Sequence, residues 1–441
     1  MNTRALPDVE HPSWKDRWRR WSDGAGSRKT AWKRAWWPEP VAAREMWEQL
    51  LFSRLTSIAV GWVALGLLPT QYVSPNFNIS TFPPVMMWIR WDAVWYITIA
   101  LHGYSSSQTL AFFPLYPMAI AGVHFVTRLP IAISALVASN LALIGAAAVF
   151  WLLMREYFPK AVAGRALAMF LLFPTAYYMS AAYTESLFLL TTLATFLLAK
   201  RGRLWEAGVA GALAALTRNQ GVLTAVAILF AYVDRYGGWR FGGPRTVPDG
   251  GTSFVRRQWN RLWDTVGWNW CHWEILSVLV PFMGLGAFMY WQWTAFHSPL
   301  AFLSAQAYWG RFTAWPWVGI WAAVARVWNG SPLQPAAVLS MIDLSFTVAF
   351  FALWWVGRKQ GLPLSWLIYW GLLWLIDVSA PDLSGESPLL SMSRLVLVIF
   401  PVFATLGMLT ERPGWNRLLR WLFPMLQATF FVVFATWHWI A

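Results

Sequence analysis

The chain has 441 residues, of which 58% are hydrophobic and only 12% are charged. A soluble domain carries about 45–50% apolar and about 25% charged residues, so this composition excludes a soluble enzyme, and it equally excludes a disordered chain. The 34 Lys and Arg exceed the 20 Asp and Glu by 14, which in so apolar a chain indicates basic cytoplasmic loops and contacts with anionic lipids, not nucleic-acid binding. We therefore predict an all-α polytopic membrane protein that contacts membrane lipids and no nucleic acid.

The first 49 residues are basic, rich in Trp and without a long apolar run. Trp14, Trp18 and Trp21 recur at helical spacing and share one face, while most of the basic side chains between them point elsewhere. This pattern predicts an amphipathic helix that lies in the membrane interface, and a disordered basic tail is the alternative. We divide the chain into a cytoplasmic interfacial segment, 1–49, and a membrane-spanning domain, 50–441.

About eleven apolar segments predict membrane-spanning helices, because about 20 apolar residues cross a hydrocarbon core. They are 50–69, 111–127, 131–154, 161–182, 184–199, 204–234, 273–297, 336–357, 362–378, 393–410 and 420–441. Basic stretches flank 204–234 on both sides, at 200–203 and 235–261, although a single span would place its two ends on opposite sides of the membrane. Either 204–234 is a re-entrant or hairpin pair, or one of these basic stretches is external.

Charge assigns sides to the loops, because Lys and Arg accumulate on the cytoplasmic side of membrane proteins. The stretches predicted to be cytoplasmic are the N-terminal tail, 235–261, 358–359 and 411–420. The stretches predicted to be external are 70–110, 298–335 and the acidic loop 379–393, which contains Asp382 and Glu386.

The first external loop contains a helical pattern of aromatic residues, Trp88, Trp91 and Trp95. Arg90 and Asp92 interrupt it, and each would cost about 2.5–3.5 kcal/mol at the centre of a bilayer, so we expect a helix along the outer surface and not a span. Asp92, at the boundary of water and lipid, is a candidate base for chemistry on an amphipathic substrate. The alternatives are that it pairs with Arg90 or caps a neighbouring helix.

Metal-ligand patterns are weak in this chain. It contains one Cys, Cys271, and its six His form no HxH or HxxxH pair. Neither a Cys-based metal site nor a His cluster is therefore predicted, and we expect a protein that needs no metal and no other cofactor.

Several motifs occur in one order over residues 90–401. They are Arg90-Trp91-Asp92-Ala93-Val94-Trp95-Tyr96 with Gly103-Tyr104, Ala111-Phe112-Phe113-Pro114-Leu115-Tyr116-Pro117, Tyr183-Thr184-Glu185-Ser186-Leu187-Phe188, Leu216-Thr217-Arg218-Asn219-Gln220-Gly221, Trp309-Gly310-Arg311, and Ser393-Arg394 with Phe400-Pro401. In this order they resemble the GPI mannosyltransferase 2 (PIG-V) family and its bacterial relatives, members of the GT-C superfamily of membrane glycosyltransferases. The first-loop motif is the most specific of them, and residues 1–49 lie outside the resemblance.

The resemblance implies a GT-C-like fold, with amphipathic helices of the first external loop, 70–110, on the outer surface and a catalytic domain over 50–441. It implies a reaction that moves a sugar, mannose by resemblance, with inversion from a polyprenyl-phosphate-linked donor to a hydroxyl of a lipid or glycan acceptor on the external face. Asp92 would be the general base. Ala93 and Val94 follow it, so the motif has a single carboxylate, which argues against a bound metal ion.

Three arginines are expected to stabilise the negative phosphate of the leaving carrier: Arg218, Arg311 and Arg394. Each has an alternative position. Arg218 would otherwise lie in a cytoplasmic turn, Arg311 would be exposed, and Arg394 would start a helix at the headgroups.

The remaining substrate contacts require polar and aromatic groups, for which the candidates are Arg90, Tyr96, Tyr104, Glu185 and Asn219. Tyr96 follows Asp92 by about one helical turn, so the two side chains share a face. Glu185 has a second interpretation, as an acidic residue that caps the next helix.

A transporter or flippase of a polyprenyl-linked lipid is the competing function, because it would share the hydrophobic composition and the basic phosphate contacts. Transporters show repeated halves and ionisable residues at the midplane, and this sequence shows neither clearly. A transferase needs a carboxylate such as Asp92 in an external aromatic helix and a transporter does not. A structural subunit without chemistry is the third alternative, and the ordered polar motifs argue against it.

Overall fold

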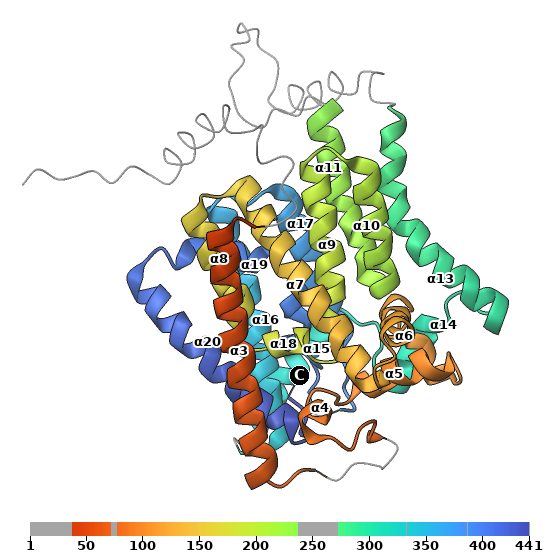
Figure 1. Ribbon diagram of the computed structural model, residues 1–441, viewed down its shortest axis with the longest axis vertical. Coiled ribbons are helices and arrows are strands. Elements are labelled where there is room, and N and C mark those ends of the chain that lie inside the picture. The colour runs from red at the N-terminus through yellow and green to blue at the C-terminus, as the bar shows by residue number, and fades with distance from the viewer. Residues whose placement is uncertain (1–37, 72–76, 237–271, 332, 386, 441) are drawn as a thin grey trace, which may run out of the picture.

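The computed structural model describes residues 38–71, 77–236, 272–331, 333–385 and 387–440, and every regular element in these ranges is a helix (Figure 1). The predicted all-α class is therefore confirmed for the described residues. The interfacial helix expected around Trp14–Trp21 lies outside them, as do most of the basic stretch 235–261 and Glu386.

Five helices are long and apolar enough to cross a membrane. They are α3 (Pro40–Leu67), α7 (Ile131–Tyr157), the continuous pair η6 and α13 (Trp273–Phe296), α16 (Pro335–Lys359) and α20 (Pro413–Ala435). A sixth arises if Met392–Val398 and Pro401–Leu409, which meet at 88°, count as one broken span. Eleven full spans are not shown, because most of the other expected segments form helices that are too short to cross a bilayer by themselves.

The shorter helices fall into two groups. Those within the bundle are α8 (Lys160–Leu172), α9 (Glu185–Lys200), α10 (Leu204–Thr217), α11 (Ala225–Tyr236), α17 (Leu364–Val378) and α19 (Pro401–Leu409). Those in the connections are α4 (Pro83–Met86), α5 (Asp92–His102), α6 (Leu115–Thr127), α14 (Ala301–Ser304), α15 (Pro316–Asn329) and α18 (Met392–Leu395). The segment expected to span at 111–127 is thus only the 13-residue α6.

The first long helix starts earlier than its apolar run. We expected a span from Leu50, whereas α3 begins at Pro40, which occupies its first turn. Proline is favoured there because its missing N–H would have no partner within the helix. The boundary drawn after residue 49 therefore falls inside α3.

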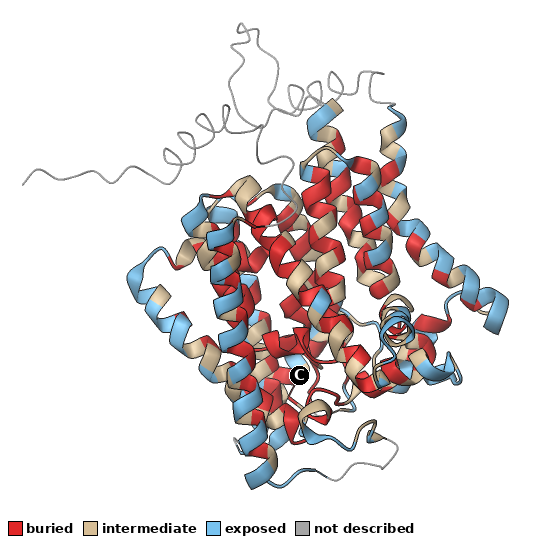
Figure 2. Ribbon diagram, in the orientation of Figure 1, coloured by how far each residue is buried: buried red, intermediate tan, exposed pale blue. Residues whose placement is uncertain are grey.

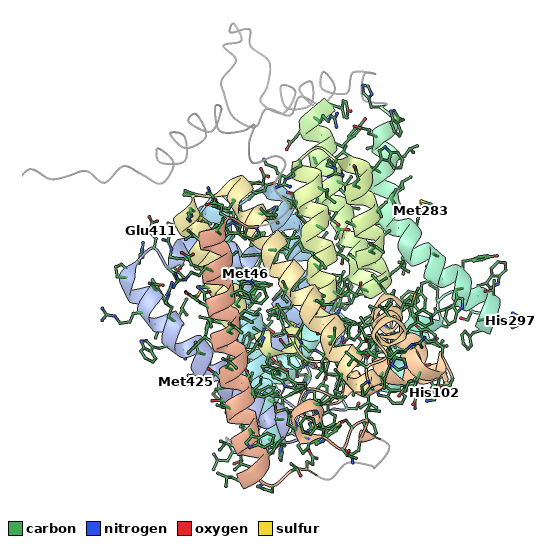
Figure 3. All side chains as sticks on the ribbon, in the orientation of Figure 1. Met46, His102, Met283, His297, Glu411 and Met425 are labelled. Carbon is green, nitrogen blue, oxygen red and sulfur yellow. The ribbon has the colours of Figure 1, made fainter. Side chains whose placement is uncertain are left out.

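Ion pairs bring several helix ends together at one end of the bundle, here called the basic end. The Nζ of Lys160 at the start of α8 lies 3.8 Å from the Oε2 of Glu39, just before α3. The Nε of Arg201 after α9 lies 2.9 Å from the Oε1 of Glu156 in α7. Figure 3 shows Glu411 toward this end and His102, the last residue of α5, toward the opposite one.

The segment expected at 204–234 is a hairpin of α10 and α11, which run side by side (Figure 1). The Nη1 of Arg235 in α11 donates to the carbonyl oxygen of Gly202, just before α10, at 2.9 Å. The described parts of the two flanking basic stretches, 200–203 and 235–236, therefore lie at the basic end. Of the two alternatives left open by the sequence, the structure contains the hairpin, and it places the intervening break, 218–224, at the end of the hairpin away from the basic end.

A glycine makes this hairpin possible. The break includes the 3-10 helix η4 (Asn219–Thr224), which packs back on the end of α10. A Cβ added at Gly221 would lie 2.2 Å from backbone atoms of Ala214 and Ala215. Only a residue without a side chain allows so close an approach.

Burial separates the interior of the bundle from its outer surface. Figure 2 shows buried residues concentrated in α7, α8 and α9, and exposed ones along α3, α13 and α20. The exposed positions of α3 and α13 include large apolar side chains such as Phe52, Leu55, Met283 and Trp293. Exposed apolar side chains on long helices are expected where the solvent is lipid.

Candidate active site

A cavity of about 570 Å³ lies at the end of the bundle opposite the basic end. Its polar lining comes from the start of α5 (Asp92, Tyr96), the break after α10 (Arg218, Asn219, Gln220), the segment before α15 (Trp309, Arg311), the end of α17 (Asp377) and α18 (Arg394). These segments are distant in the chain, so the cavity exists only in the folded protein. Helix α9 begins at Glu185, beside this cavity, and ends at Lys200, at the basic end. Its 16 residues span about 24 Å, which is the separation of the two ends along this helix.

Two carboxylates and two guanidinium groups form a continuous chain of ion pairs beside this cavity. The Nη1 of Arg394 donates to the Oδ2 of Asp92 at 2.9 Å, and the Nε of Arg394 lies 3.6 Å from the Oε1 of Glu185. The Nη2 of Arg218 donates to the same oxygen of Glu185 at 2.5 Å. The side chain of Asp92 is 22% exposed and that of Glu185 is fully buried, so Asp92 is the carboxylate that reaches the cavity.

Glu185 is the buried counterion of this chain. It occupies the first turn of α9, where no side-chain cap is formed. Thr184 before it accepts a hydrogen bond from the Nε of Arg218 at 2.9 Å. Of the two roles considered for Glu185, the structure shows no helix cap, and its Oε1 is shared between Arg218 and Arg394; contact with a sugar hydroxyl stays a prediction. Burying two cations requires such an anion, since desolvation penalises unpaired charges.

The backbone around Asp92 is strained. Trp91, directly before it, has a φ of 51°, a value that bulky residues rarely adopt. Its ring centroid lies 5.6 Å from that of Trp437 and 5.1 Å from that of Trp439, and this packing holds the turn. Ser391, which lines the cavity just before α18, and Trp437 have φ values of 63° and 66°. Strain of this kind persists where surrounding contacts over-determine a functional geometry.

Arg90 lies outside the cavity. Its Nε and Nη2 donate to the carbonyl oxygen of Ala435 at 3.0 and 2.7 Å, and its guanidinium lies 4.6 Å from the ring centroid of Trp437. It therefore fixes the first loop to the end of α20. The pairing of Asp92 with Arg90, considered from the sequence, does not occur, because the partner of Asp92 is Arg394.

Tyr96 and Asn219 line the cavity together with Asp92. Tyr96 follows Asp92 by one turn of α5, so the expected common face is present. Burial raises the pKa of the Tyr96 phenol well above its ordinary value, so the group stays neutral and keeps its proton for hydrogen bonding.

Arg311 enters the cavity from the loop before α15, and only part of its surface is exposed. Its Nη2 donates to the carbonyl oxygen of Leu390 at 2.9 Å. Gly310, with a φ of 70°, packs against Asp382, whose Oδ1 would lie 2.6 Å from an added Cβ. Asp382 itself is buried and accepts hydrogen bonds from Ser384 and Gly385. The external loop expected at 379–393 is thus folded against the site.

Sequence reasoning missed Asp377, Gln220 and two aromatic residues of the lining, Trp309 and Trp439. Asp377 is near the end of α17, in a segment that we interpreted only as a span. An acidic residue in an apolar segment is itself a signal of function, and this signal was available. Gln220 falls within the motif that contains Arg218. Among the described residues, no three of the His, Cys, Asp and Glu side chains are grouped so that they could hold a metal ion.

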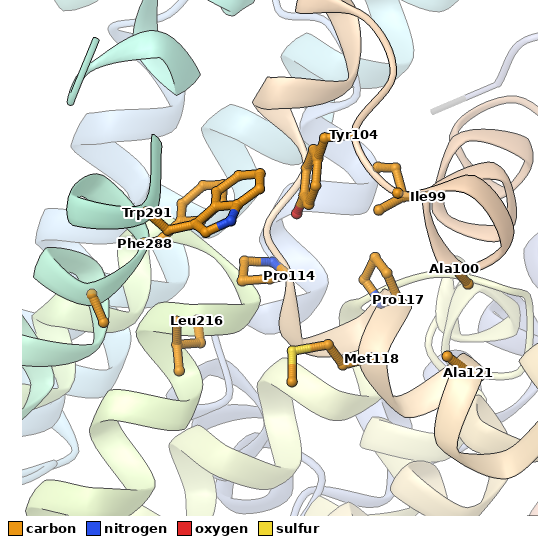
Figure 4. Close-up of a pocket in the computed structure, with 12 residues that line it drawn as sticks. Ile99, Ala100, Tyr104, Pro114, Pro117, Met118, Ala121, Leu216, Phe288 and Trp291 are labelled. Carbon is orange, nitrogen blue, oxygen red and sulfur yellow. The ribbon is translucent and has the colours of Figure 1, made fainter. Parts of the chain in front are cut away.

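A second cavity, of about 540 Å³, is almost entirely apolar (Figure 4). Tyr104, Phe288, Trp291, Met118 and Leu216 are among the residues that line it. Tyr104 belongs to this cavity and not to the polar one, and its hydroxyl donates to the carbonyl oxygen of Phe112 at 2.8 Å.

Residues that are adjacent in the chain line the two different cavities. Phe113 and Thr217 line the polar cavity, while their chain neighbours Pro114 and Leu216 line the apolar one. The two cavities are therefore neighbours across these backbone segments.

Comparison with known proteins shows which family this chain resembles. Residues 47–238 match the family described as mannosyltransferase (PIG-V). The GPI mannosyltransferase 2 of Cryptococcus neoformans var. neoformans is 30% identical over 173 residues, which cover 37% of this chain and 40% of that protein. The GPI alpha-1,6-mannosyltransferase 2 of Rattus norvegicus is 32% identical over 145 residues, covering 31% of this chain and 30% of that protein. The matches thus span 40% or less of the length of these relatives.

A solved structure is also similar to the chain, although weakly. The oligosaccharyltransferase of Archaeoglobus fulgidus is 12% identical, with a TM-score of 0.36 over 88% of this chain and 54% of that one. This score is too low to establish a common fold. The resemblance to the PIG-V mannosyltransferase family, in contrast, is confirmed by the family match and the curated relatives.

Proposed function

We propose that this multi-pass membrane protein, which matches the PIG-V mannosyltransferase family over residues 47–238, is a membrane mannosyltransferase. It would transfer mannose, with inversion, from a polyprenyl-phosphate-linked donor to a hydroxyl of a lipid or glycan acceptor. The observation that best supports this proposal is a single cavity that joins one accessible carboxylate, Asp92, with the guanidinium groups of Arg218, Arg311 and Arg394. The relatives named GPI mannosyltransferase suggest a glycolipid as acceptor.

The proposed reaction needs a base at the acceptor hydroxyl. The hydroxyl oxygen attacks the anomeric carbon, Asp92 takes its proton, and the bond from that carbon to the phosphate oxygen breaks, with its electron pair leaving on the phosphate. A positioned base contributes about 10²–10⁴-fold to such a step. The hydrogen bond from Arg394 fixes the direction of the Asp92 carboxylate, and Tyr96 and Asn219 lie where they can orient the sugar.

The leaving phosphate carries negative charge, which cationic donors stabilise in a partly buried site. We propose that Arg218, Arg311 and Arg394 supply these donors. Three carboxylates, Asp92, Glu185 and Asp377, balance the charge of these three guanidinium groups. The phosphate would therefore be held by directed hydrogen bonds from the arginines and not by a net positive charge of the cavity. The proposal requires no metal ion, because the guanidinium groups supply the charge.

The apolar cavity supports a carrier lipid as the donor. A polyprenyl chain is apolar and its phosphate is charged, so the two parts need different surroundings. The apolar cavity at Leu216 and Phe288 adjoins the polar cavity at Arg218, so we propose that the isoprenoid units nearest to the phosphate occupy it.

We propose that the active site is external. Lys160, Lys200, Arg201, Arg203 and Arg235 lie at or next to the basic end of the bundle, and Lys and Arg accumulate on the cytoplasmic side of membrane proteins. The cavity lies at the opposite end, so this charge distribution supports a cytoplasmic N-terminus and an external acceptor.

The decisive experiment incubates the purified protein with radiolabelled polyprenyl-phosphate-mannose and total membrane lipids. We expect a new labelled lipid or glycan, and we expect the Asp92→Asn variant to form it about 10²–10⁴-fold more slowly. Absence of any product would contradict the proposal. The competing function would be supported if reconstituted protein moved the intact labelled lipid across a vesicle bilayer without transferring its sugar.

A further inference from the structure

We propose that Asp377, oriented by Gln220, forms a second subsite of the polar cavity and accepts hydrogen bonds from hydroxyl groups of the transferred sugar. This inference rests on the proposed function and adds to it a contact that determines how the sugar is held. It concerns a carboxylate to which the mechanism above gives no role.

One oxygen of this buried carboxylate has no partner. The Nε2 of Gln220 donates to the Oδ1 of Asp377 at 2.6 Å, whereas the Oδ2 is shielded from solvent and accepts no hydrogen bond. Asp377 is 8% exposed and lines the cavity. A buried charged oxygen without a donor is costly, so a ligand that brings hydroxyl groups to this position would relieve the cost.

Two other buried carboxylates nearby, those of Asp343 and Asp382, accept hydrogen bonds that hold the protein's own backbone and side chains. The Oδ1 of Asp343 accepts from the backbone N–H of Ser393 at 3.0 Å, and its Oδ2 accepts from the hydroxyl of Ser387 at 2.8 Å. Asp382 accepts hydrogen bonds within its own turn. Neither lines the cavity, and Asp377 differs from both because it lines the cavity and keeps an oxygen free.

The chemistry of this subsite fits hydroxyl groups better than phosphate. A carboxylate repels a phosphate and accepts hydrogen bonds from hydroxyls. Gln220 lies two residues after Arg218 in the same break of the hairpin, so one short segment reaches both a proposed phosphate contact and Asp377. The sugar is bonded directly to the phosphate, so it must occupy the space next to Arg218. Asp377 and Asp92 both line this space.

Binding of two lipids that differ only in the sugar tests the inference. Polyprenyl-phosphate-mannose and polyprenyl phosphate are each titrated into the wild-type protein and the Asp377→Asn variant. We expect the variant to bind the mannose-bearing lipid about 10-fold or more weakly, as loss of a hydrogen bond to a charged group implies. Binding of polyprenyl phosphate should change by less than twofold. Asp377→Ala should show the same selectivity with an equal or larger loss.

Two controls make the result interpretable. Asp234→Asn removes an exposed carboxylate at the end of α11, far from the cavity, and both lipids should bind this variant as they bind the wild type. The unfolding temperature of each variant shows whether it is folded. Equal losses for both lipids in a folded variant, or no loss for either, would overturn the inference.

The same measurements separate this inference from the proposed function, because binding requires no transfer. If the protein binds the mannose-bearing lipid through Asp377 but forms no product, the proposed function fails and the subsite stands. If it transfers mannose and Asp377→Asn shows no selective loss, the subsite alone fails.

Discussion

Asp92 and Arg394 are 302 positions apart in the chain, yet a hydrogen bond of 2.9 Å joins their side chains. This contact gives the candidate base a fixed direction. It also means that the proposed base and one proposed phosphate contact are not independent, since removing either leaves the other without its partner. Variants of these two residues must therefore be compared by more than total activity.

Replacing Asp92 by Asn keeps the size of the side chain and removes its basicity. If Asp92 takes the acceptor proton, the rate of transfer should fall by about 10²–10⁴-fold, the usual size of general-base effects. Donor binding and the unfolding temperature should change little, because the side chain is partly exposed and Asn can still accept a hydrogen bond from Arg394. Initial rates, donor titrations and thermal unfolding measure the three quantities.

The control for this variant must be an acidic residue outside the site. Asp382 is unsuitable because it is buried and holds a turn against Gly310, beside Arg311. Asp234→Asn is suitable because Asp234 is exposed, and it should retain nearly full activity. A near wild-type rate for Asp92→Asn would contradict the assignment, as would a variant that is inactive only because it no longer binds the donor.

Replacing Arg394 by Ala removes a proposed phosphate contact. The loss of one charge-assisted hydrogen bond costs about 1.5–3 kcal/mol, so kcat/KM for the donor should fall roughly 10–150-fold. The KM for the acceptor should change much less. Because Arg394 also contacts Asp92 and Glu185, the unfolding temperature should fall too.

Arg394→Lys separates the two roles of this residue. It keeps the positive charge but cannot reach two carboxylates with a planar fork, so it should restore part of the donor affinity. Equal effects of Arg394→Ala on donor and acceptor would show that its main role is to support Asp92.

At the scale of elements, the hairpin of α10 and α11 decides the position of Arg218. Helix α10 ends at Thr217, and the chain then turns back through η4, so Arg218 extends from the innermost point of the hairpin to Glu185. Both ends of the hairpin lie at the basic end and its break does not, so a cytoplasmic basic end, as proposed, would exclude a cytoplasmic turn at Arg218. A re-entrant segment is tolerated at membrane depth only where protein or a cavity surrounds its backbone, and both are present here.

Gly221→Ala should disrupt this hairpin. The added Cβ would lie 2.2 Å from backbone atoms of Ala214 and Ala215, so η4 must move away from α10, and Arg218 and Gln220 must move with it. We expect a lower unfolding temperature and at least a 10-fold loss of donor binding. Thermal unfolding and donor titration measure these effects.

A second glycine provides the matched control. A Cβ added at Gly66 in α3 would meet nothing within 4 Å, and alanine is favoured over glycine inside a helix by about 1 kcal/mol. Gly66→Ala should therefore leave activity unchanged and stability unchanged or slightly higher. Similar behaviour of the two variants would show that the close approach at Gly221 does not control the site.

At the scale of the whole molecule, the basic end and the cavity end should face opposite sides of the membrane. Single cysteines at Ser106 and Gly414, in a Cys271→Ser background, should react oppositely with an impermeant thiol reagent in intact cells. Ser106 is exposed near the cavity end, and Gly414 is exposed in the first turn of α20. We expect Ser106→Cys to be labelled and Gly414→Cys to be protected.

The hairpin adds a second test to this labelling. Arg203→Cys and Asp234→Cys, at the two ends of the hairpin, should behave like Gly414→Cys, whereas a single span would place them on opposite sides. Labelling of Gly414→Cys with protection of Ser106→Cys would put Asp92 on the cytoplasmic side and contradict an external acceptor.

Local properties of the sequence were sufficient for several features of this protein. Composition alone indicates the membrane class and the helical fold, because a chain with so few charges can satisfy its backbone in lipid most simply by forming helices. The motif that begins at Arg90 and the confirmed family resemblance depend on contiguous residues. Six of the nine candidate site residues, namely Asp92, Tyr96, Arg218, Asn219, Arg311 and Arg394, do line one cavity.

Only the tertiary structure decided which charges pair and which residues remain free. Arg90 and Glu185 both belong to motifs in the sequence, yet Arg90 fixes the first loop to α20 and Glu185 is a buried counterion. Asp377 was overlooked because a carboxylate at the end of an apolar helix acquires a role only from what the fold places opposite it. Apolar patterns determine which segments enter the membrane. The partners of a buried charge depend on contacts between distant segments, which no local pattern contains.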